Sequence, residues 1–222
     1  MTQTTKALVF DLDGTLADTP ALITELITGV MAEFDRYPTP EAVHATVGRP
    51  LEASLASLLG TTVQDPRADA AVLRYRERYE KEVLTWGPQL LFPGVPEGLA
   101  RLREAGYPLG IATSKILRSA RSLLEVTGIR DCFDVLACHD LVSRGKPDPE
   151  MGQLALRVLG ASAERSWYVG DTSTDMQMAV AAGMRALGVS YGVDDARQLI
   201  AGGAEQVVSS FDEVVEVLLD EH

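Results

Sequence analysis

Cysteine is scarce in this sequence of 222 residues, which holds only Cys132 and Cys138 and no CxxC motif. The two cysteines lie around a single predicted strand. Residues placed in this way are usually packed inside a domain, so we expect two buried, reduced thiols and not a disulfide framework.

Basic residues are also few, because Lys and Arg number 20 against 32 Asp and Glu, which gives a formal net charge of −12. Binding to nucleic acid or to an anionic membrane surface requires a basic face, so this balance argues against both kinds of partner. An anionic small substrate remains compatible with the sequence where local cations overcome the overall negative field.

The sequence contains only short apolar runs, and none of them is long enough to span a bilayer. The polar stretch from Met1 to Thr5 lacks the basic-then-apolar plan of a signal peptide, so we expect a cytoplasmic protein. The hydrophobic share of 46% and charged share of 23% are typical of a globular chain, and the length suits one large domain or one domain with an insert.

The most informative stretch that is present runs from Lys6 to Leu16, with the sequence KALVFDLDGTL. An unbroken apolar run, Leu8 to Phe10, is typical of a strand buried on both faces. It ends in two carboxylates, Asp11 and Asp13, whose side chains point the same way on an extended chain. Gly14 then permits a sharp turn. A solvated turn is the plain interpretation, whereas a divalent cation would explain why two like charges are held together.

The rest of the chain alternates between strand and helix patterns, except for one long helical stretch. Residues 18–88 show only helical periodicity, beginning where Asp18 or Thr19 can cap a helix and Pro20 suits its first turn. The charged run 74–82 predicts a solvated helix face. Strands are predicted at residues 6–11, 109–113, 135–138, 167–170, 186–189 and 206–208, with helices between most of them. This alternation predicts an α/β fold with a parallel sheet between helical layers, whose ligands bind at the carboxyl ends of the strands.

Two polar clusters follow predicted strands and could contact a phosphate group. Thr113, Ser114 and Lys115 close the second strand, where hydroxyl and backbone N–H groups can hold phosphoryl oxygens, although a plain helix cap is the commoner role. Lys146 lies beside Pro147 in a GKPDP sequence. Proline stiffens the backbone and so fixes the direction of the lysine, which suits a charge that offsets a phosphoryl group. A surface lysine is the alternative.

A third cluster, GDTSTD, follows the fourth strand and contains Asp171 and Asp175. Together with Asp11 and Asp13 it makes four carboxylates, which is too many anions for one site without a metal. Carboxylate oxygens combined with a substrate phosphate suit Mg²⁺. Asp175 can also serve as an acidic residue near a helix N-terminus, and the two roles are compatible.

In order along the chain, DLDGTL, TSK, GKPDP and GDTSTD resemble the motifs of the haloacid dehalogenase (HAD) superfamily, most closely its phosphoglycolate phosphatase-like branch. The resemblance spans nearly the whole chain. It implies a Rossmann-like parallel-sheet core formed by residues 1–17 and 89–222, with an inserted all-helical cap over residues 18–88. The implied activity is a Mg²⁺-dependent phosphatase acting on a small phosphorylated metabolite, such as a 2-phosphoglycolate-like monoester.

The resemblance also implies catalytic roles for particular residues. Asp11 would be the nucleophile that forms an aspartyl-phosphate, and Asp13 would be the general acid and base. Thr113 and Ser114 would hold the phosphoryl group while Lys146 offsets its charge, and Gly14 and Lys115 are grouped with the substrate-binding residues. Ser114 departs from the Asn that phosphoglycolate phosphatases often carry there, which leaves the substrate open.

The metal ligands implied by the resemblance are Asp11, the backbone carbonyl of Asp13, and Asp171. Asp175 would complete the metal site through a water molecule or orient Lys146. Relatives that dehalogenate lack the second aspartate of the first motif, so Asp13 favours phosphate chemistry.

Arg49, between Gly48 and Pro50 in a predicted loop of the cap, is our candidate for a substrate contact, with a salt bridge at the surface as the alternative. Other activities compatible with the same residues are a phosphomutase of the β-phosphoglucomutase type and a pyrophosphatase. A catalytically silent binding protein on the same fold is the rival of another class. The sequence is compatible with a monomer or a homodimer.

Overall fold

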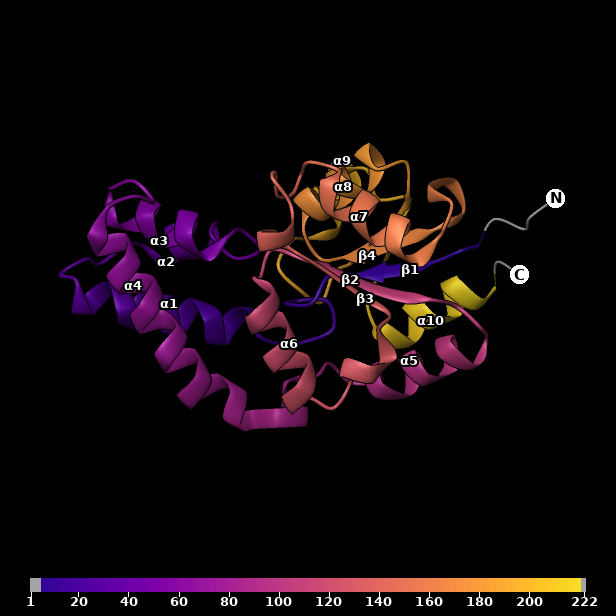
Figure 1. Cartoon of the computed structure of the whole chain (residues 1–222), viewed down its shortest axis with the longest axis horizontal. Coiled ribbons are helices and arrows are strands. Elements are labelled where there is room, and N and C mark those ends of the chain that lie inside the picture. The colour runs from indigo at the N-terminus through magenta and orange to yellow at the C-terminus, as the bar shows by residue number, and fades with distance from the viewer. Residues whose placement is uncertain (1–4, 221–222) are drawn as a thin grey trace.

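The computed structural model describes residues 5–220, which form a parallel sheet flanked by helices and a separate group of helices to one side (Figure 1). The sheet has six strands in the order β3-β2-β1-β4-β5-β6, and all their pairings are parallel. The strands are β1 (Leu8–Phe10), β2 (Leu109–Thr113), β3 (Val135–Cys138), β4 (Trp167–Gly170), β5 (Arg185–Val189) and β6 (Gln206–Val208). The expected Rossmann-like α/β class is therefore confirmed.

The first strand, β1, lies in the interior of the sheet, with Leu8 paired to Leu109 of β2 on one side and to Trp167 of β4 on the other. All three of its residues are fully buried. Leu8 and Phe10 join one hydrophobic cluster and Val9 joins a second, because successive side chains of a strand point to opposite faces. The unbroken apolar run is thus explained by burial on both faces.

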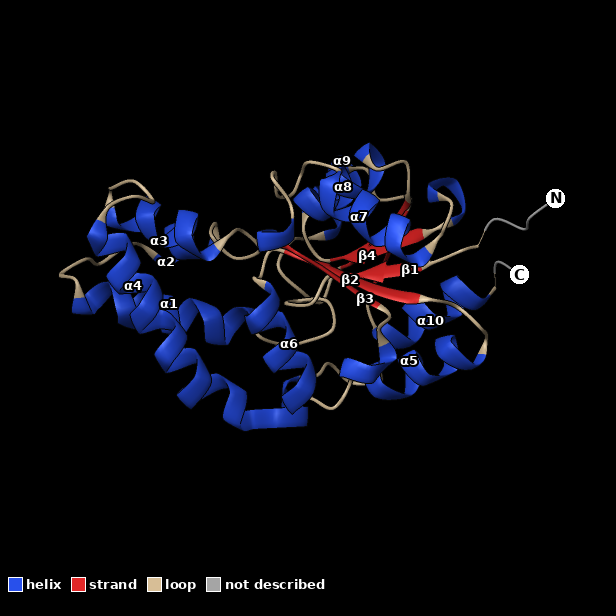
Figure 2. Cartoon of the chain, viewed as in Figure 1, coloured by secondary structure: helices blue, strands red, loops and turns tan. Residues whose placement is uncertain are grey.

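Helices cover both faces of the sheet (Figure 2). One layer contains α7 (Glu150–Leu159), α8 (Ser173–Ala181) and α9 (Ala196–Gly202), and the other contains α5 (Val95–Glu104), α6 (Leu117–Val126) and α10 (Phe211–Leu219). Helix α9 is absent from the sequence-based assignment, although Asp195 and Gln198 form a capping box at its start. Short 3₁₀ turns are η3 (Arg130–Cys132), η4 (His139–Leu141) and η5 (Ala163–Arg165).

The chain between Pro20 and Leu90 is helical, and it forms the group of helices beside the sheet (Figure 1). Its elements are α1 (Pro20–Glu33), α2 (Pro40–His44), α3 (Leu51–Leu59), α4 (Pro66–Arg78), a π-helix η1 (Tyr79–Val83) and a 3₁₀-helix η2 (Leu84–Leu90). The charged run 74–82, predicted to lie on one helix face, is therefore divided between α4 and η1. The chain changes helix type at Tyr79 and bends at Gly87, which has a φ of 55°.

The two ends of this helical segment lie side by side. The Asp18 N–H donates to the Leu90 carbonyl at 2.7 Å, and the Phe92 N–H donates to the Leu16 carbonyl at 3.0 Å. The segment therefore leaves and rejoins the sheet domain at one place, a few residues after Asp11 and Asp13.

Both cysteines are free, as expected, and Cys138 is buried, but Cys132 is only half-buried because it lies in the short η3 turn before β3. Across residues 5–220, none of the helices combines the length and the apolar character needed to cross a bilayer. Residues 1–4 of the polar N-terminal stretch lie outside the described residues.

Candidate active site

The order of the strands reverses at β1, because the chain moves from β1 to β2 and β3 on one side and later adds β4 to the other side. In open α/β sheets, ligands bind outside the carboxyl ends of the strands at this switch point. Asp11 follows β1, Thr113 ends β2 and Asp171 follows β4. Asp11, Thr113 and Asp171, which the sequence predicts as site residues, therefore lie at the same edge of the sheet.

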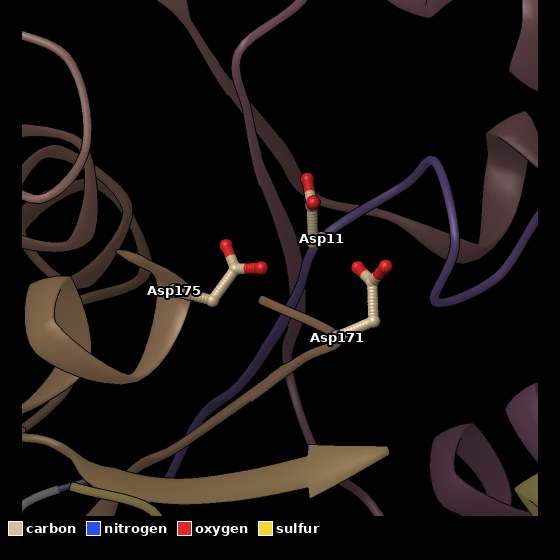
Figure 3. Close-up of side chains that lie close together, drawn as sticks. All are labelled: Asp11, Asp171 and Asp175. Carbon is tan, nitrogen blue, oxygen red and sulfur yellow. The ribbon is translucent and has the colours of Figure 1, made fainter. Parts of the chain in front are cut away.

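Three of the four predicted carboxylates form one cluster. Asp11, Asp171 and Asp175 each offer a carboxylate oxygen within 4.8 Å of the others, and all three residues are buried (Figure 3). Gly14 has a φ of 81°, and a Cβ atom there would collide with the Asp171 carboxylate. Glycine is therefore required at this turn for its conformation and for the space that Asp171 occupies.

A single buried lysine lies against this cluster. The Lys146 Nζ lies 2.6 Å from Asp175 Oδ1 and 3.0 Å from Asp11 Oδ1, and the lysine side chain is only 2% exposed. Burial works to lower the pKa of Lys146, but the charges of Asp11 and Asp175 outweigh it and keep that pKa above its usual value. The predicted role of Lys146 as a charge inside the site, as opposed to a surface lysine, agrees with this position.

One ammonium group does not balance three buried carboxylates. Burial is the main cause that raises the pKa of Asp11 to about 7, with Lys146 acting in the opposite direction. Burial, followed by the charges of Asp175 and Asp11, also holds the pKa of Asp171 well above its usual range. Oxygen donors in excess of the available positive charge are the ligand set that Mg²⁺ prefers, so these residues fit a divalent cation.

Asp175 and Asp171 differ in how their oxygens are used. Asp175 Oδ2 accepts hydrogen bonds from the Thr172 N–H at 3.0 Å and from its hydroxyl at 2.6 Å. The Asp175 N–H donates in turn to the Thr172 hydroxyl at 3.2 Å, which completes the capping box of α8. The other carboxylate oxygen of Asp175 contacts Lys146 and lies 3.1 Å from the Tyr168 hydroxyl. Asp175 thus caps a helix and orients Lys146, so both predicted roles are compatible.

Asp171 is held by two donors, the Thr15 hydroxyl and the Val193 N–H, each at 3.0 Å from one of its oxygens. Sequence reasoning singled out none of Thr15, Tyr168 and Val193. They lie in or beside strands and loops whose proximity depends on the fold.

Asp13 lies apart from the three-carboxylate cluster and has two partners of its own. Asp13 Oδ1 accepts a hydrogen bond from the Thr19 hydroxyl at 2.5 Å, and Lys115 Nζ lies 3.1 Å from Asp13 Oδ2. Thr19 occupies the cap position of α1 but makes no side-chain capping bond. Its hydroxyl is directed to Asp13 instead, which differs from the predicted capping role.

Thr113 and Ser114 are not helix caps. Helix α6 begins only at Leu117, with Ile116 at its cap position. The Leu117 N–H donates a hydrogen bond to Asp140 Oδ1 at 2.8 Å. Thr113 is buried, and the Ser114 hydroxyl is buried with no hydrogen-bond partner within residues 5–220. The capping alternative is therefore wrong. The Thr113 hydroxyl accepts a hydrogen bond from the Lys115 N–H at 3.3 Å and keeps its own proton for a ligand, whereas the Ser114 hydroxyl can both donate to a ligand and accept from it.

A cavity of about 320 Å³ lies between the sheet edge and the helical segment. Its wall includes Asp11, Asp13 and the stretch Thr113 to Ile116 on one side, and residues of α1, α3, α4 and η1 on the other. Arg49 is exposed on this wall, and the described part of the chain offers it no ion-pair partner. The alternative of a surface salt bridge for Arg49 is therefore not observed.

The charged run 74–82 is only partly a solvated face. Arg74 and Arg78 form ion pairs with Glu33 on the outside of α4, as a solvated face predicts. Tyr75 and Tyr79 are buried instead, with their rings stacked at 5.8 Å, and both line the cavity. Their spacing of four residues places them on one helix face, which is the signal that the sequence offered.

Residues 8–189 match the family model of haloacid dehalogenase-like hydrolases. A protein of Dickeya dadantii named "Probable phosphatase IndB" is 44% identical over 94% of this chain and 91% of its own. A plasmid-encoded phosphoglycolate phosphatase of Cupriavidus necator is 34% identical over 93% of this chain and 90% of its own. The crystal structure of a haloacid dehalogenase-like hydrolase from Bacteroides fragilis superposes with a TM-score of 0.83 at 28% identity, covering 95% of this chain and 99% of that one.

The chain therefore belongs to the haloacid dehalogenase-like hydrolases. The expectation of an enzyme of the phosphoric monoester hydrolase class is confirmed by this membership and by the phosphatases among its relatives. The rival interpretation as a catalytically silent binding protein finds no support in these comparisons.

Proposed function

We propose that this enzyme is a Mg²⁺-dependent phosphatase that hydrolyses a small phosphorylated metabolite through an aspartyl-phosphate on Asp11. The observation that carries the proposal is the buried cluster of Asp11, Asp171 and Asp175 at the switch point, with Lys146 as its close cation. Asp11 and Asp13 line the cavity, so a substrate can reach the cluster from there.

In the first step, a carboxylate oxygen of Asp11 attacks phosphorus, a new P–O bond to Asp11 forms, and the bond to the leaving alcohol breaks. Asp13 donates its proton to the leaving oxygen, which departs as a neutral alcohol. The contacts of Asp13 with Thr19 and Lys115 hold its carboxyl group on the cavity side of the turn. Thr113 and Ser114 would donate hydrogen bonds to the phosphoryl oxygens.

In the second step, Asp13 takes a proton from water as the water oxygen bonds to phosphorus. The P–O bond to Asp11 then breaks, which releases inorganic phosphate and restores the Asp11 carboxylate. Lys146 remains against Asp11 throughout and offsets the negative charge that gathers around phosphorus.

Asp11, Asp171 and the backbone carbonyl of Asp13 are the groups that would hold Mg²⁺. When bound, the ion would supply positive charge that screens the nucleophile from the phosphoryl oxygens. One oxygen of Asp175 is taken by the Lys146 ammonium, whereas the partners of Asp171 are a neutral hydroxyl and an N–H group, so we assign Asp175 to orienting Lys146.

We further propose that residues 18–88 act as a cap over the core formed by residues 1–17 and 89–222. The hydrogen bond between Asp18 and Leu90 supports this division, because the two strands of chain that connect the helical segment to the core lie side by side there and could act as one hinge. Arg49 would contact the phosphate from the cap. A cytoplasmic location and a monomeric or homodimeric state stay predictions.

The test is phosphate release from a panel of phosphorylated compounds, with and without Mg²⁺, for the wild type and Asp11→Asn. The panel includes acetyl phosphate, 2-phosphoglycolate, sugar phosphates, nucleoside monophosphates and pyrophosphate. We expect Mg²⁺-dependent release by the wild type and a loss of ~10⁴-fold or more in the variant, with the folded circular dichroism spectrum retained. Substantial activity of the folded Asp11→Asn protein would contradict the role of Asp11, and silence of the wild type across the panel would favour a mutase.

A further inference from the structure

Among the charged side chains that line the cavity, the cations do not outnumber the carboxylates. Four are cationic, namely Arg49, Arg76, Lys115 and Arg118. Five are acidic, namely Asp11, Asp13, Glu52, Glu77 and Glu80, and Asp11 has its own cation in Lys146 just outside the wall, so the other charges balance. A site built to hold a phosphate together with a second anionic group would need an excess of cations.

Three of the four cations already have carboxylate partners. Lys115 lies 3.1 Å from Asp13, and Arg118 lies 3.4 Å from Glu80. The Arg76 guanidinium lies 2.6 Å from Glu52.

Within residues 5–220, Arg49 is the lining cation without an ion pair, and the proposed function assigns it to the phosphate. No cation of the cavity wall in the described chain is then left for a carboxylate on the leaving group.

The cavity does offer neutral hydrogen-bonding groups. Tyr79 is 5% exposed and lines the cavity, and its hydroxyl has no hydrogen-bond partner among the described residues. A buried hydroxyl without a partner is costly unless a ligand supplies one. Burial and then the charge of Asp13 hold the pKa of Tyr79 well above its usual range, so the hydroxyl stays protonated and can both donate and accept.

The position of Tyr79 is set by an irregular helix. It is the first residue of the π-helix η1, it stacks on Tyr75, and Lys115 Nζ lies 4.5 Å from the centre of its ring. Single-turn π-helices occur frequently at functional sites, because they redirect the side chains of one turn. Lys115 therefore links the Tyr79 ring to Asp13, the proposed proton donor to the leaving group.

The size and the remaining lining of the cavity fit a leaving group that contains a ring better than a short carboxylic acid. Its volume of about 320 Å³ corresponds to roughly ten water molecules. Ile23, Ile27 and Leu84 provide apolar wall, whereas the Arg76 Nε is a further buried donor with no hydrogen bond inside the described ranges. Apolar wall with a few neutral or already neutralised polar groups is the lining that suits an uncharged, hydroxyl-bearing ring.

We propose that Tyr79 and Arg76 form a subsite for the leaving group, and that the preferred substrate is the phosphate monoester of an uncharged, hydroxyl-bearing ring alcohol. A phosphorylated carboxylic acid such as 2-phosphoglycolate is disfavoured by the same wall. This inference rests on the proposed phosphatase function, and it adds the class of the leaving group.

The first test compares kcat/KM for a hexose 6-phosphate, a nucleoside 5′-monophosphate and 2-phosphoglycolate in the wild type, Tyr79→Phe and Tyr37→Phe. The two ring phosphates distinguish a free sugar from a nucleoside as the source of the shared chemistry. We expect the wild type to prefer one of them over 2-phosphoglycolate. Tyr79→Phe should reduce that preference by about 3- to 10-fold, mainly through KM, because one hydrogen bond is lost. Tyr37 is 81% exposed and serves as the matched control, which should match the wild type.

The second test changes the charge balance of the wall. Glu52→Gln removes the partner of Arg76 and leaves one cation free, so kcat/KM for 2-phosphoglycolate should rise about 3-fold or more relative to the ring phosphates. Glu33→Gln is the control, because Glu33 pairs with Arg74 and Arg78 outside the cavity and should leave this ratio unchanged.

A wild-type preference for 2-phosphoglycolate would overturn the inference, and so would an equal effect of Tyr79→Phe on all three substrates. In both cases acetyl phosphate would still be hydrolysed. If the proposed function itself is wrong, the wild type releases no phosphate from acetyl phosphate or from any ester, so the two failures are distinguishable.

Discussion

Lys146 and Asp175 form a short, buried ion pair in the candidate site, with 2.6 Å between the lysine Nζ and the aspartate Oδ1. Both side chains are almost completely buried, and the same Nζ also contacts Asp11 at 3.0 Å. Because Asp175 is at the same time part of the capping box of α8, this helix start fixes the lysine that faces the proposed nucleophile.

This relationship predicts that Asp175→Asn lowers kcat by roughly 100-fold without changing the Mg²⁺ concentration that gives half-maximal activity. The amide can still accept the bonds from Thr172, but it has no charge with which to hold Lys146. Steady-state kinetics over a range of Mg²⁺ concentrations measures both quantities. Recovery of full activity at high Mg²⁺ would show instead that Asp175 binds the metal directly.

Metal binding should be visible without turnover. We expect Mg²⁺ to raise the melting temperature of the wild type, because an ion that binds the folded state alone stabilises it. Asp171→Asn should lose most of this shift, whereas Asp175→Asn should retain it. A calorimetric melting series with and without Mg²⁺ tests the assignment, which an unchanged shift in Asp171→Asn would contradict.

The metal-free protein should lose stability as the pH rises. The pKa of Asp11 is raised by burial from 3.8 to about 7, so ionising this carboxylate costs more in the folded state than in the unfolded chain. The contribution of Asp11 to stability is therefore fully present below pH ~4 and is lost between about pH 4 and 7. Asp11→Asn cannot ionise there, so its melting temperature should exceed that of the wild type by several degrees at pH 7.5 and by little at pH 4.5.

Melting curves in a metal chelator at the two pH values measure this difference. The control is Asp131→Asn, because Asp131 is exposed in the η3 turn and its replacement should follow the wild type. An equal melting temperature of Asp11→Asn and the wild type at pH 7.5 would show that the buried carboxylate is not under electrostatic strain.

Arg49→Ala should raise KM for phosphate esters by roughly 10- to 100-fold with a smaller change in kcat, because a charge-assisted contact to the substrate is lost. Arg36→Ala is the comparison, since Arg36 is exposed in the same helical segment and is not part of the cavity wall. Unchanged kinetics of Arg49→Ala would show that Arg49 does not contact the substrate.

The sequence alone was sufficient to predict the strands and the polar residues that follow them. The apolar run at Leu8 to Phe10 is interpretable because a strand buried on both faces admits no polar residue. Asp11, Thr113 and Asp171 were predictable as neighbours because parallel strands bring their carboxyl ends to one edge. Lys146 was recognisable by its place in the GKPDP motif.

The tertiary structure decided which partner each of these groups has. The Thr19 hydroxyl could have capped α1, and only the return of the chain toward Asp13 shows that it bonds the aspartate instead. Tyr79 looked like one residue of a solvated helix, but the change to a π-helix and the packing of α4 turn its ring toward Lys115. Such choices depend on distances between segments far apart in sequence, where several local arrangements have similar energy and packing selects one.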